Sequence, residues 1–587
     1  MPQLTNGLQR IGLLRGVLIG LFALAALSQA RVQLFSRGAI LDRARETQRF
    51  TQSRVETAKR GAIFTNDGKP LAVDDDRYVL GVTFSRVPQS DGFFVDLATA
   101  SGMPATEFSQ IAYREPRKTK FWREHLTSIE ALAVRDVKAK WRADGISLEP
   151  TGERAYPLGE AASGLVGRVR EGQPEGGMES GFNGQLRGKD GKTIGLRDRT
   201  GAFLPMRIDP ESVARRDGEP IVTTLDSVLQ QEAAAAIKTA VEVNKADQGV
   251  ALAMDPNTGD ILAMANWPTF DPNDTSGATL QAEASDFNPN IMGGFEPGST
   301  FKILTLAKAM DLGKVRDGDT VYCRGEKVVW ADRSVHCDLH GGTRAHGAVT
   351  PALGISKSCN VAAATWAGEI GRDTFIEYLE ELGLLGKQGL GLPGERAGSI
   401  FRDEYATGLQ LANFGFGQSI SATPVGLIGA FGMLANDGVR MIPRLVKKIG
   451  GREQEPQSAG AIVRPETAQQ LMRYMEAVIE SDAGTGRSLR IPGYRLGGKT
   501  GTAQRKNRGN GYISSFVGFV PVEAPRAVIL VMIDYPKAGK YYGASVAGPV
   551  FHDLARAVIR RYGIPPSSAR KEQEGAPALP QRVPPGR

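Results

Sequence analysis

FEPGSTFK, at residues 295–302, joins an extended segment to an apolar helical pattern that continues with Leu304, Leu306 and Met310. Because Gly298 ends the extended segment, Ser299 is predicted to lie at the N-terminus of a helix. Lys302 follows three residues later, so both side chains share one face of the first turn. Such a lysine can act as a general base if burial, a neighbouring cation or the helix terminus lowers its pKa from about 10.4. The exposed N–H groups of this turn can hold an oxyanion.

Two further motifs strengthen this interpretation, because a Ser-x-x-Lys spacing alone occurs by chance in a chain of 587 residues. Ser358-Cys359-Asn360 follows an apolar helical stretch, and Lys499-Thr500-Gly501-Thr502 precedes a predicted strand. Their order and wide spacing are typical of a three-part active site. The same set, Ser-x-x-Lys with Ser-x-Asn and Lys-Thr-Gly, marks penicillin-binding proteins and class A β-lactamases.

Over almost its whole length the chain resembles a class B penicillin-binding protein, a monofunctional peptidoglycan D,D-transpeptidase. It resembles the cell-division (septal) type more than the elongation type, since Thr500 replaces a serine. Outside the three motifs, the resemblance rests on Arg60-Gly61-Ala62-Ile63, Asn66-Asp67-Gly68, Leu71-Ala72, Arg154, Tyr156-Pro157, Gly181 to Gly188, Gly415-Phe416-Gly417-Gln418 with Thr423-Pro424, and Gly497 to Gln504.

The resemblance implies a role for each motif residue. Ser299 would attack the carbonyl of the penultimate D-alanine of a stem peptide, with Lys302 taking its proton. Ser358 and Asn360 would relay protons and hold the substrate amide. Lys499 would lower the pKa of Lys302 and steer the terminal carboxylate. The expected substrate-binding residues are Thr500, Gly501 and Thr502, and the oxyanion hole would be formed by the N–H groups of Ser299 and Thr502. No metal ligand and no cofactor are expected.

The chain is too long for one hydrophobic core, which stops growing at about 250 to 300 residues. Four parts are predicted: a cytoplasmic tip and transmembrane anchor (1–30), a stalk and irregular β-rich pedestal (31–217), an α+β, sandwich-like transpeptidase domain (218–564) and a disordered tail (565–587). The tail is assigned from its proline, serine and charged residues.

Within the catalytic part, the hydrophobic periodicity predicts several elements. They are a helix from Ser227 to about Asn244 capped by Asp226 or Thr224, a hairpin of Gly249–Met254 and Ile261–Ala265, helices at about Phe301–Leu312, Pro351–Ala364 and Pro465–Ile479, and a strand at Ala527–Ile533.

The N-terminal segment from Ile11 to Ala30 is apolar apart from Arg15, Ser28 and Gln29. It is just long enough to span a membrane if Arg15 reaches the interface. A cleavable signal peptide is the alternative, because Ser28-Gln29-Ala30 resembles a cleavage site. Both interpretations place the rest of the chain across the membrane. The expected location is the inner (plasma) membrane, single-pass, with the catalytic domain on the periplasmic side.

The net charge of +8 is spread along the chain, so no nucleic-acid partner is expected. The resemblance implies other partners: peptidoglycan stem peptides and nascent glycan strands, β-lactam antibiotics, a membrane glycosyltransferase and divisome proteins. An elongation-type transpeptidase and a D,D-carboxypeptidase stay open as alternatives. Gly493 to Thr500 also satisfies the phosphate-loop pattern of nucleotide-binding proteins. No apolar strand leads into Gly493, however, and residues 501–509 do not continue as an apolar-faced helix.

A cluster of cysteine and histidine residues lies outside the three motifs. Cys323, His336, Cys337, Asp338, His340 and His346 are close in sequence, and Cys359 follows. Such clusters can bind zinc, but the spacing matches no compact zinc motif. A disulfide between Cys323 and Cys337 is equally compatible with an extracytoplasmic location. Cys359 is expected to be a buried packing residue.

Overall fold

The computed structural model describes residues 3–34, 51–197, 203–205, 212–274, 287–330, 333–338, 344–401, 407–482, 484–505 and 511–567. By its contacts the chain forms two compact units, one of Met1–Lys59 with Gly188–Gly218 and one of Arg60–Arg187 with Glu219–Arg587. Most of the predicted stalk and nearly all of the predicted tail lie outside the described residues. The four-part division of the chain stays a prediction.

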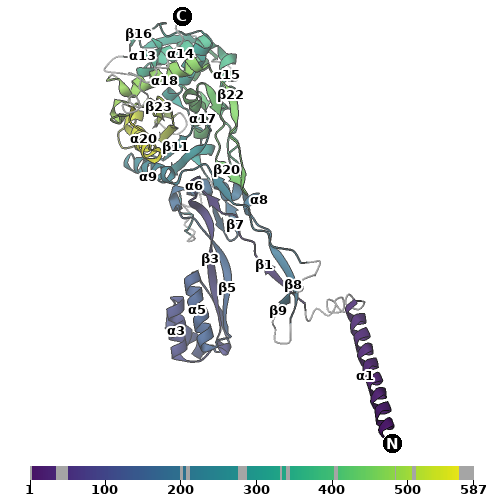
Figure 1. The fold of residues 1–587 in the computed structure, drawn as a ribbon. Helices are drawn as coiled ribbons and strands as arrows, with labels where there is room; N and C mark the ends of the chain where they lie inside the picture. The colour runs from purple at the N-terminus through teal and green to yellow at the C-terminus, as the bar shows by residue number, and fades with distance from the viewer. Residues whose placement is uncertain are drawn as a thin grey trace. The chain divides into compact units, whose positions relative to one another are not determined.

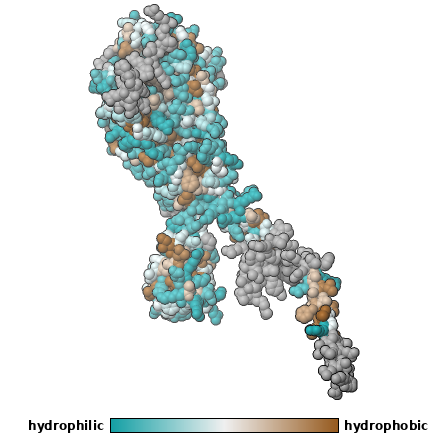
Figure 2. Space-filling model, viewed as in Figure 1, coloured by the Kyte–Doolittle hydropathy of each residue, from teal (hydrophilic) through white to brown (hydrophobic). Residues whose placement is uncertain are grey.

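The first unit contains the N-terminal helix and a small sheet. Helix α1 (Gln3–Leu34) includes one stretch, Leu14–Arg31, that is long and apolar enough to cross a membrane. Its side chains are exposed, and Figure 2 shows apolar residues gathered on the described part of this helix. Strands β1 (Thr51–Glu56), β8 (Gly191–Arg197) and β9 (Phe203–Pro205) form an antiparallel sheet in that order.

The catalytic part of the second unit is built on a five-stranded antiparallel sheet (Figure 1). Its strand order is β12 (Ile261–Trp267), β11 (Gln248–Met254), β25 (Ala527–Asp534), β24 (Gly511–Val520) and β23 (Gly497–Arg505). Successive side chains of a strand point to opposite faces. Ala251 and Ala253 pack in one core with helices α9 (Ser227–Val243) and α20 (Gly548–Tyr562), whereas Val250 and Leu252 pack in a second core with α17 (Pro424–Ala435).

Most of the elements predicted for this part are confirmed. Asp226 caps α9, because its carboxylate accepts hydrogen bonds from the N–H groups of Val228 and Leu229 at 3.0 and 3.1 Å. Strands β11 and β12 form the predicted hairpin. The other two predicted helices are α12 (Lys302–Asp311), which follows a short 3-10 turn at Gly298–Thr300, and α18 (Pro465–Glu480).

The single helix predicted over Pro351–Ala364 is wrong. The structure has two helices, α13 (Pro351–Ser356) and α14 (Asn360–Ile370). Between them Ser358 has a φ of 54°, a left-handed conformation that interrupts the helix. The Cys359 thiol then caps α14 by accepting from the N–H of Ala362 at 3.4 Å. This break places the Ser-x-Asn motif on a turn.

Residues 60–155 form a sheet and a separate helical lobe. Strand β3 (Pro70–Thr83) pairs with β2 (Ile63–Phe64), β4 (Thr119–Leu126) and β5 (Ile146–Ala155), and the sheet continues through β10 (Ile221–Thr223) to β20 (Val446–Ile449) and β21 (Arg452–Glu453). Helices α3 (Asp91–Ser101), α4 (Ala105–Arg114) and α5 (Ser128–Trp141) enclose their own core. The predicted irregular module did not include these helices.

A buried ionic cluster joins four segments of the second unit, which contribute Arg60, Asp74, Arg154 and Glu179. The Glu179 carboxylate, fully buried, accepts from Arg154 at 2.7 Å and from Arg60 at 2.5 Å. Arg154 also donates to Asp74 at 2.9 Å. Two arginines therefore share the available carboxylates, and no member of the cluster can be removed without leaving a buried charge short of partners.

Candidate active site

Ser299 lies on a tight turn that packs against strand β23. Gly298 has a φ of +58°, and its N–H donates to the carbonyl oxygen of Gly417 at 2.9 Å. A Cβ atom at Gly298 would lie 2.7 Å from the Cβ of Ala503 on β23. Only glycine allows this approach of the turn to the strand. The half-buried Ser299 is therefore held beside the strand that carries the Lys-Thr-Gly motif.

Lys302, the first residue of α12, is fully buried. Its amine donates to the carbonyl oxygen of Ser358 at 2.6 Å and to the Ser358 hydroxyl at 3.0 Å. Among the described residues, the Ser299 side chain makes no hydrogen bond, as is common for catalytic groups in sites without substrate. Burial lowers the pKa of Lys302 to about 8, although the negative charge of Asp338 opposes the shift.

Lys499 on β23 reaches the same hydroxyl. Its amine donates to Ser358 Oγ at 3.1 Å and to the carbonyl oxygen of Thr500 at 2.9 Å. Burial, together with the charge of Lys302, lowers the pKa of Lys499 well below its usual range. Repulsion between two cations is mutual, so each ammonium favours the neutral form of the other. Lys302, Ser358 and Lys499 thus form one hydrogen-bonded group.

Asn360 starts α14 directly after this turn. Its side-chain N–H donates to the carbonyl oxygen of His336 at 2.7 Å. His336 ends strand β15 (Arg333–His336), which pairs with β14 (Glu326–Trp330). The Asn360 side chain is therefore oriented by a hairpin that is distant in sequence from the other motif residues.

Thr500, Gly501 and Thr502 lie on β23, the edge strand of the catalytic sheet. A Cβ atom at Gly501 would lie 2.8 Å from Thr300 Cγ2, so glycine is needed where the strand passes the turn that carries Ser299. The Thr502 hydroxyl accepts from the N–H of Gly543 at 3.2 Å. A phosphate loop requires a helix after its Lys-Thr pair. The strand at this position rules out the phosphate-loop alternative.

Sequence reasoning missed an aromatic group beside this strand. Tyr541 stacks on Tyr512 with ring centroids 4.4 Å apart, and the rings of Tyr541 and Tyr542 are 4.5 Å apart. The backbone N–H of the next residue, Gly543, donates the hydrogen bond to the Thr502 hydroxyl. The tyrosine pair in Lys540-Tyr541-Tyr542-Gly543 was the available signal, but nothing in the sequence places this segment next to β23.

Comparisons with known proteins agree with this geometry. The penicillin binding protein transpeptidase domain matches residues 249–556, and the penicillin-binding protein dimerisation domain matches residues 55–223. Stage V sporulation protein D of Bacillus subtilis is 29% identical over 538 residues, covering 88% of this chain and 80% of that protein. Peptidoglycan D,D-transpeptidase FtsI of Escherichia coli is 28% identical over 527 residues, covering 87% and 85%. Probable peptidoglycan D,D-transpeptidase PenA of Neisseria meningitidis is 31% identical over 424 residues, covering 71% and 70%.

Solved structures show the same fold. Penicillin binding protein 3 from Mycobacterium tuberculosis, complexed with aztreonam, has a TM-score of 0.66 and 26% identity, covering 87% of this chain and 98% of that one. Penicillin Binding Protein 2X from Streptococcus thermophilus has a TM-score of 0.74 and 23% identity, covering 90% and 82%.

Fold and site together define a serine-type D-Ala-D-Ala transpeptidase with a penicillin-binding domain. The chain belongs to the penicillin-binding protein transpeptidase family, and within it to the class B proteins, in which a dimerisation domain precedes the catalytic domain.

Proposed function

We propose that this chain crosslinks stem peptides through a Ser299 acyl-enzyme during septal peptidoglycan synthesis. One observation supports the mechanism above the others: two fully buried lysines converge on Ser358 Oγ at 3.0 and 3.1 Å, next to the nucleophile turn. This arrangement supplies a base of lowered pKa and a route for its proton. Thr500 supports the septal assignment, because the resemblance connects a threonine there with the cell-division branch.

In the first half-reaction, Ser299 Oγ attacks the carbonyl carbon of the penultimate D-alanine, and Lys302 takes the hydroxyl proton. The N–H groups of Ser299 and Thr502 hold the oxyanion. Loss of one such donor typically costs about 2.7 to 4 kcal/mol. The C–N bond then breaks, and the leaving D-alanine amine receives a proton through Ser358. In the second half-reaction, an amine of a neighbouring strand attacks the ester, and Ser299 regains its proton.

The two lysine amines differ in protonation state in the proposed mechanism: Lys302 is neutral and Lys499 is charged. Both are buried, so the doubly protonated state is unfavourable and the pair loses its first proton readily. A substrate carboxylate beside Lys499, Thr500 and Thr502 would favour the state in which Lys499 keeps its proton. Lys302 is then the neutral amine and can act as the base. Substrate binding itself therefore selects the productive proton arrangement.

Mass spectrometry of a β-lactam adduct tests the nucleophile. Full-length protein in detergent is incubated with aztreonam or ampicillin, the compounds bound in the structures of the mycobacterial protein. We expect a single adduct on the peptide that contains Ser299 and none in Ser299→Ala. Ser356→Ala, which changes a partly buried serine of α13, is the matched control and should be labelled normally. An adduct on another serine would reject the mechanism.

The septal role requires a test in cells. Depletion of the protein from its own organism should give filaments without septa, whereas rounded cells would indicate the elongation-type alternative. Purified protein with a stem-peptide donor and an acceptor amine should form more crosslinked than hydrolysed product. Predominant release of D-alanine without crosslinking would favour the carboxypeptidase alternative.

We also infer a membrane location with the catalytic domain outside the cytoplasm. The apolar stretch Leu14–Arg31 and the FtsI-type relative support an anchor, and a signal sequence would fit the same stretch. A membrane glycosyltransferase would supply nascent strands, with divisome proteins as further partners. N-terminal sequencing of the mature protein distinguishes an anchor, which keeps the segment Leu14–Arg31, from a cleaved signal, which loses it.

A further inference from the structure

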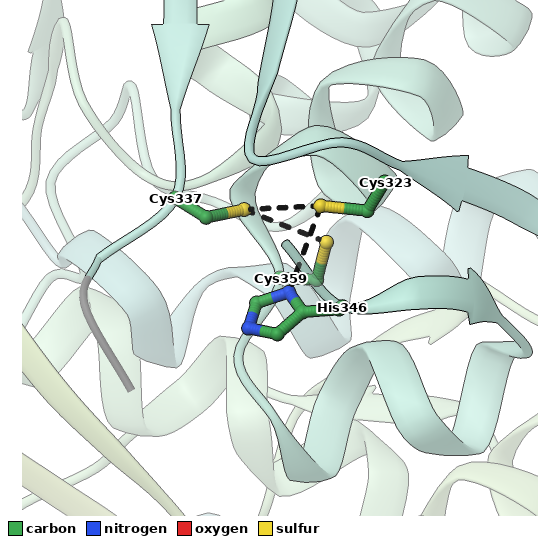
Figure 3. A group of neighbouring side chains, drawn as sticks. All are labelled: Cys323, Cys337, His346 and Cys359. Atoms are coloured by element: carbon green, nitrogen blue, oxygen red, sulfur yellow. Dashed lines mark hydrogen bonds between the residues drawn. The ribbon is translucent and has the colours of Figure 1, made fainter. Parts of the chain in front are cut away.

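Four potential metal ligands converge behind the Ser-x-Asn turn (Figure 3): Cys323, Cys337, His346 and Cys359. Their ligand atoms all lie within 4.8 Å of one another, and the three cysteines are free and buried. Of the other residues singled out in the sequence, His336 and Asp338 lie outside this group, and His340 is not among the described residues. Cys359 is buried as predicted, but it also belongs to the group.

The four ligands come from separate pieces of the chain. Cys323 ends strand β13 (Val321–Cys323), and His346 immediately precedes its partner strand β16 (Gly347–Val349). Cys337 directly follows β15, and Cys359 is the N-cap of α14. Two small two-stranded sheets and one helix thus each direct at least one ligand to a common centre. This origin explains why the spacing in the sequence resembles no compact zinc motif.

Three of the six ligand separations match those of a tetrahedral site, and all six are at most 4.8 Å. Cys337 Sγ lies 3.7 Å from Cys323 Sγ and 3.6 Å from Cys359 Sγ. Cys323 Sγ lies 3.7 Å from His346 Nδ1. Zinc binds sulfur at about 2.3 Å and imidazole nitrogen at about 2.0–2.1 Å, so a tetrahedron separates two sulfurs by about 3.8 Å and a sulfur from a nitrogen by about 3.6 Å. Side-chain adjustments of about 1 Å or less would therefore bring all four ligands into zinc-binding distance.

We propose that Cys323, Cys337, His346 and Cys359 bind a structural Zn²⁺ ion. Thiolate and imidazole ligands are those that zinc prefers, and a full set of four protein ligands is typical of structural rather than catalytic zinc. A disulfide between Cys323 and Cys337 would use two of the four groups and give no role to the other two, which converge on the same point. The metal site uses all four.

A zinc ion at this site would stabilise the small β-sheets that lie next to α14. The β13–β16 and β14–β15 sheets have two strands each, and they expose Tyr322 by 69% and Val328 by 62%. A hairpin of two strands is marginally stable on its own. A zinc ion would fasten both two-stranded sheets to the start of α14, next to Asn360. The site goes beyond the proposed function and does not depend on it.

Metal analysis of the full-length protein, purified in detergent without chelators, tests the proposal. We expect about one zinc per chain, reduced at least fivefold in Cys323→Ala and in His346→Ala. His336→Ala is the matched control, because its half-exposed imidazole lies nearby but outside the group, and it should keep its zinc. Zinc that persists in both ligand variants would place the metal elsewhere and overturn the proposal.

Two measurements on the unmutated chain remain informative if a variant fails to fold. Cobalt loaded in place of zinc should give the charge-transfer band of thiolate ligation and the visible bands of tetrahedral coordination. Thiol titration in denaturant with a chelator and no reductant should find three free thiols per chain. One free thiol per chain with no bound metal would show a disulfide instead, and cobalt spectra without thiolate bands would likewise contradict the site.

Discussion

The amine of Lys302 is held by both oxygen atoms of one residue, the carbonyl oxygen of Ser358 at 2.6 Å and its hydroxyl at 3.0 Å. This contact is possible because Ser358 has a φ of 54°, which interrupts the helix and leaves its carbonyl group outside the helical hydrogen-bond ladder. The residue that relays protons in the proposed mechanism is therefore also the residue that positions the base.

Ser358→Ala separates these two tasks. Alanine keeps the backbone carbonyl contact and has the same left-handed strain as serine, so only the hydroxyl between the two amines is lost. We expect the rate of acylation by penicillin to fall about 10²-fold or more, the usual contribution of a proton-transfer group. Stopped-flow acylation measures this, with Ser356→Ala as the control. Equal rates for the two variants would exclude Ser358 from proton transfer.

The lowered pKa of Lys302 predicts a rising pH profile. Only the neutral amine accepts the Ser299 proton, and burial lowers the pKa of Lys302 to about 8. Acylation should therefore rise about tenfold per pH unit below neutrality and level off above about pH 9. Second-order rate constants with a penicillin that is stable over this range test the sign. A rate that falls as pH rises toward 8 would show that Lys302 does not act as a neutral base.

Gly417→Ala should displace the nucleophile turn. Gly417 has a φ of +72°, and an added Cβ would collide with the carbonyl oxygen of Gly298 and lie 2.6 Å from Phe301 Cβ. Gly313 offers a matched control, since its φ is +70° and nothing lies within 4 Å of its Cβ position. Both variants carry a left-handed alanine, which costs about 1–2 kcal/mol.

Comparison of these two variants isolates the effect of crowding. We expect a small decrease in the thermal midpoint and normal acylation for Gly313→Ala, and a larger decrease with a loss of acylation of at least tenfold for Gly417→Ala. Normal acylation of Gly417→Ala would mean that the turn tolerates the shift and that the contact with Gly298 does not position Ser299.

Glu179→Gln tests the buried ionic cluster. The variant keeps the shape of the side chain but removes the charge that Arg60 and Arg154 share, at 2.5 and 2.7 Å. Breaking a buried pair typically costs about 3–5 kcal/mol, so the urea midpoint should fall clearly. Glu160→Gln removes an exposed partner of Lys238 and should have almost no effect. Equal midpoints for both variants would contradict the assigned role of the cluster.

The sequence predicts those parts of the fold that follow from local periodicity. Helix α9 has an apolar stripe and the Asp226 cap, and β25 is a continuous apolar run, so both were found with nearly correct ends. The break at Ser358 was missed, because no glycine or proline marks it. The motif residues were identified, but the sequence contains no information on the distances that bring Lys302 and Lys499 to one hydroxyl.

Other features depend on contacts between distant segments. Helix α5 begins with a capping box of Thr127 and Glu130 that is recognisable in the sequence. Helices α3 and α4, which pack in the same core, have no side-chain cap of this kind. The group around Cys359 could not be assembled from spacing, because its ligands come from two small two-stranded sheets and a helix cap.

Strand β23 is the outermost strand of the catalytic sheet, and this position has a consequence for solubility as well as for chemistry. An open sheet edge can recruit strands from other molecules and so promote aggregation. Here the close approach at Gly298 and Gly501 brings the turn that carries Ser299 next to the same strand, so a chain that pairs with this edge lies near Ser299. A short extended peptide end can pair with this edge, and it would then lie beside the serine that reacts with it. A longer strand from another molecule would have less room to pair there.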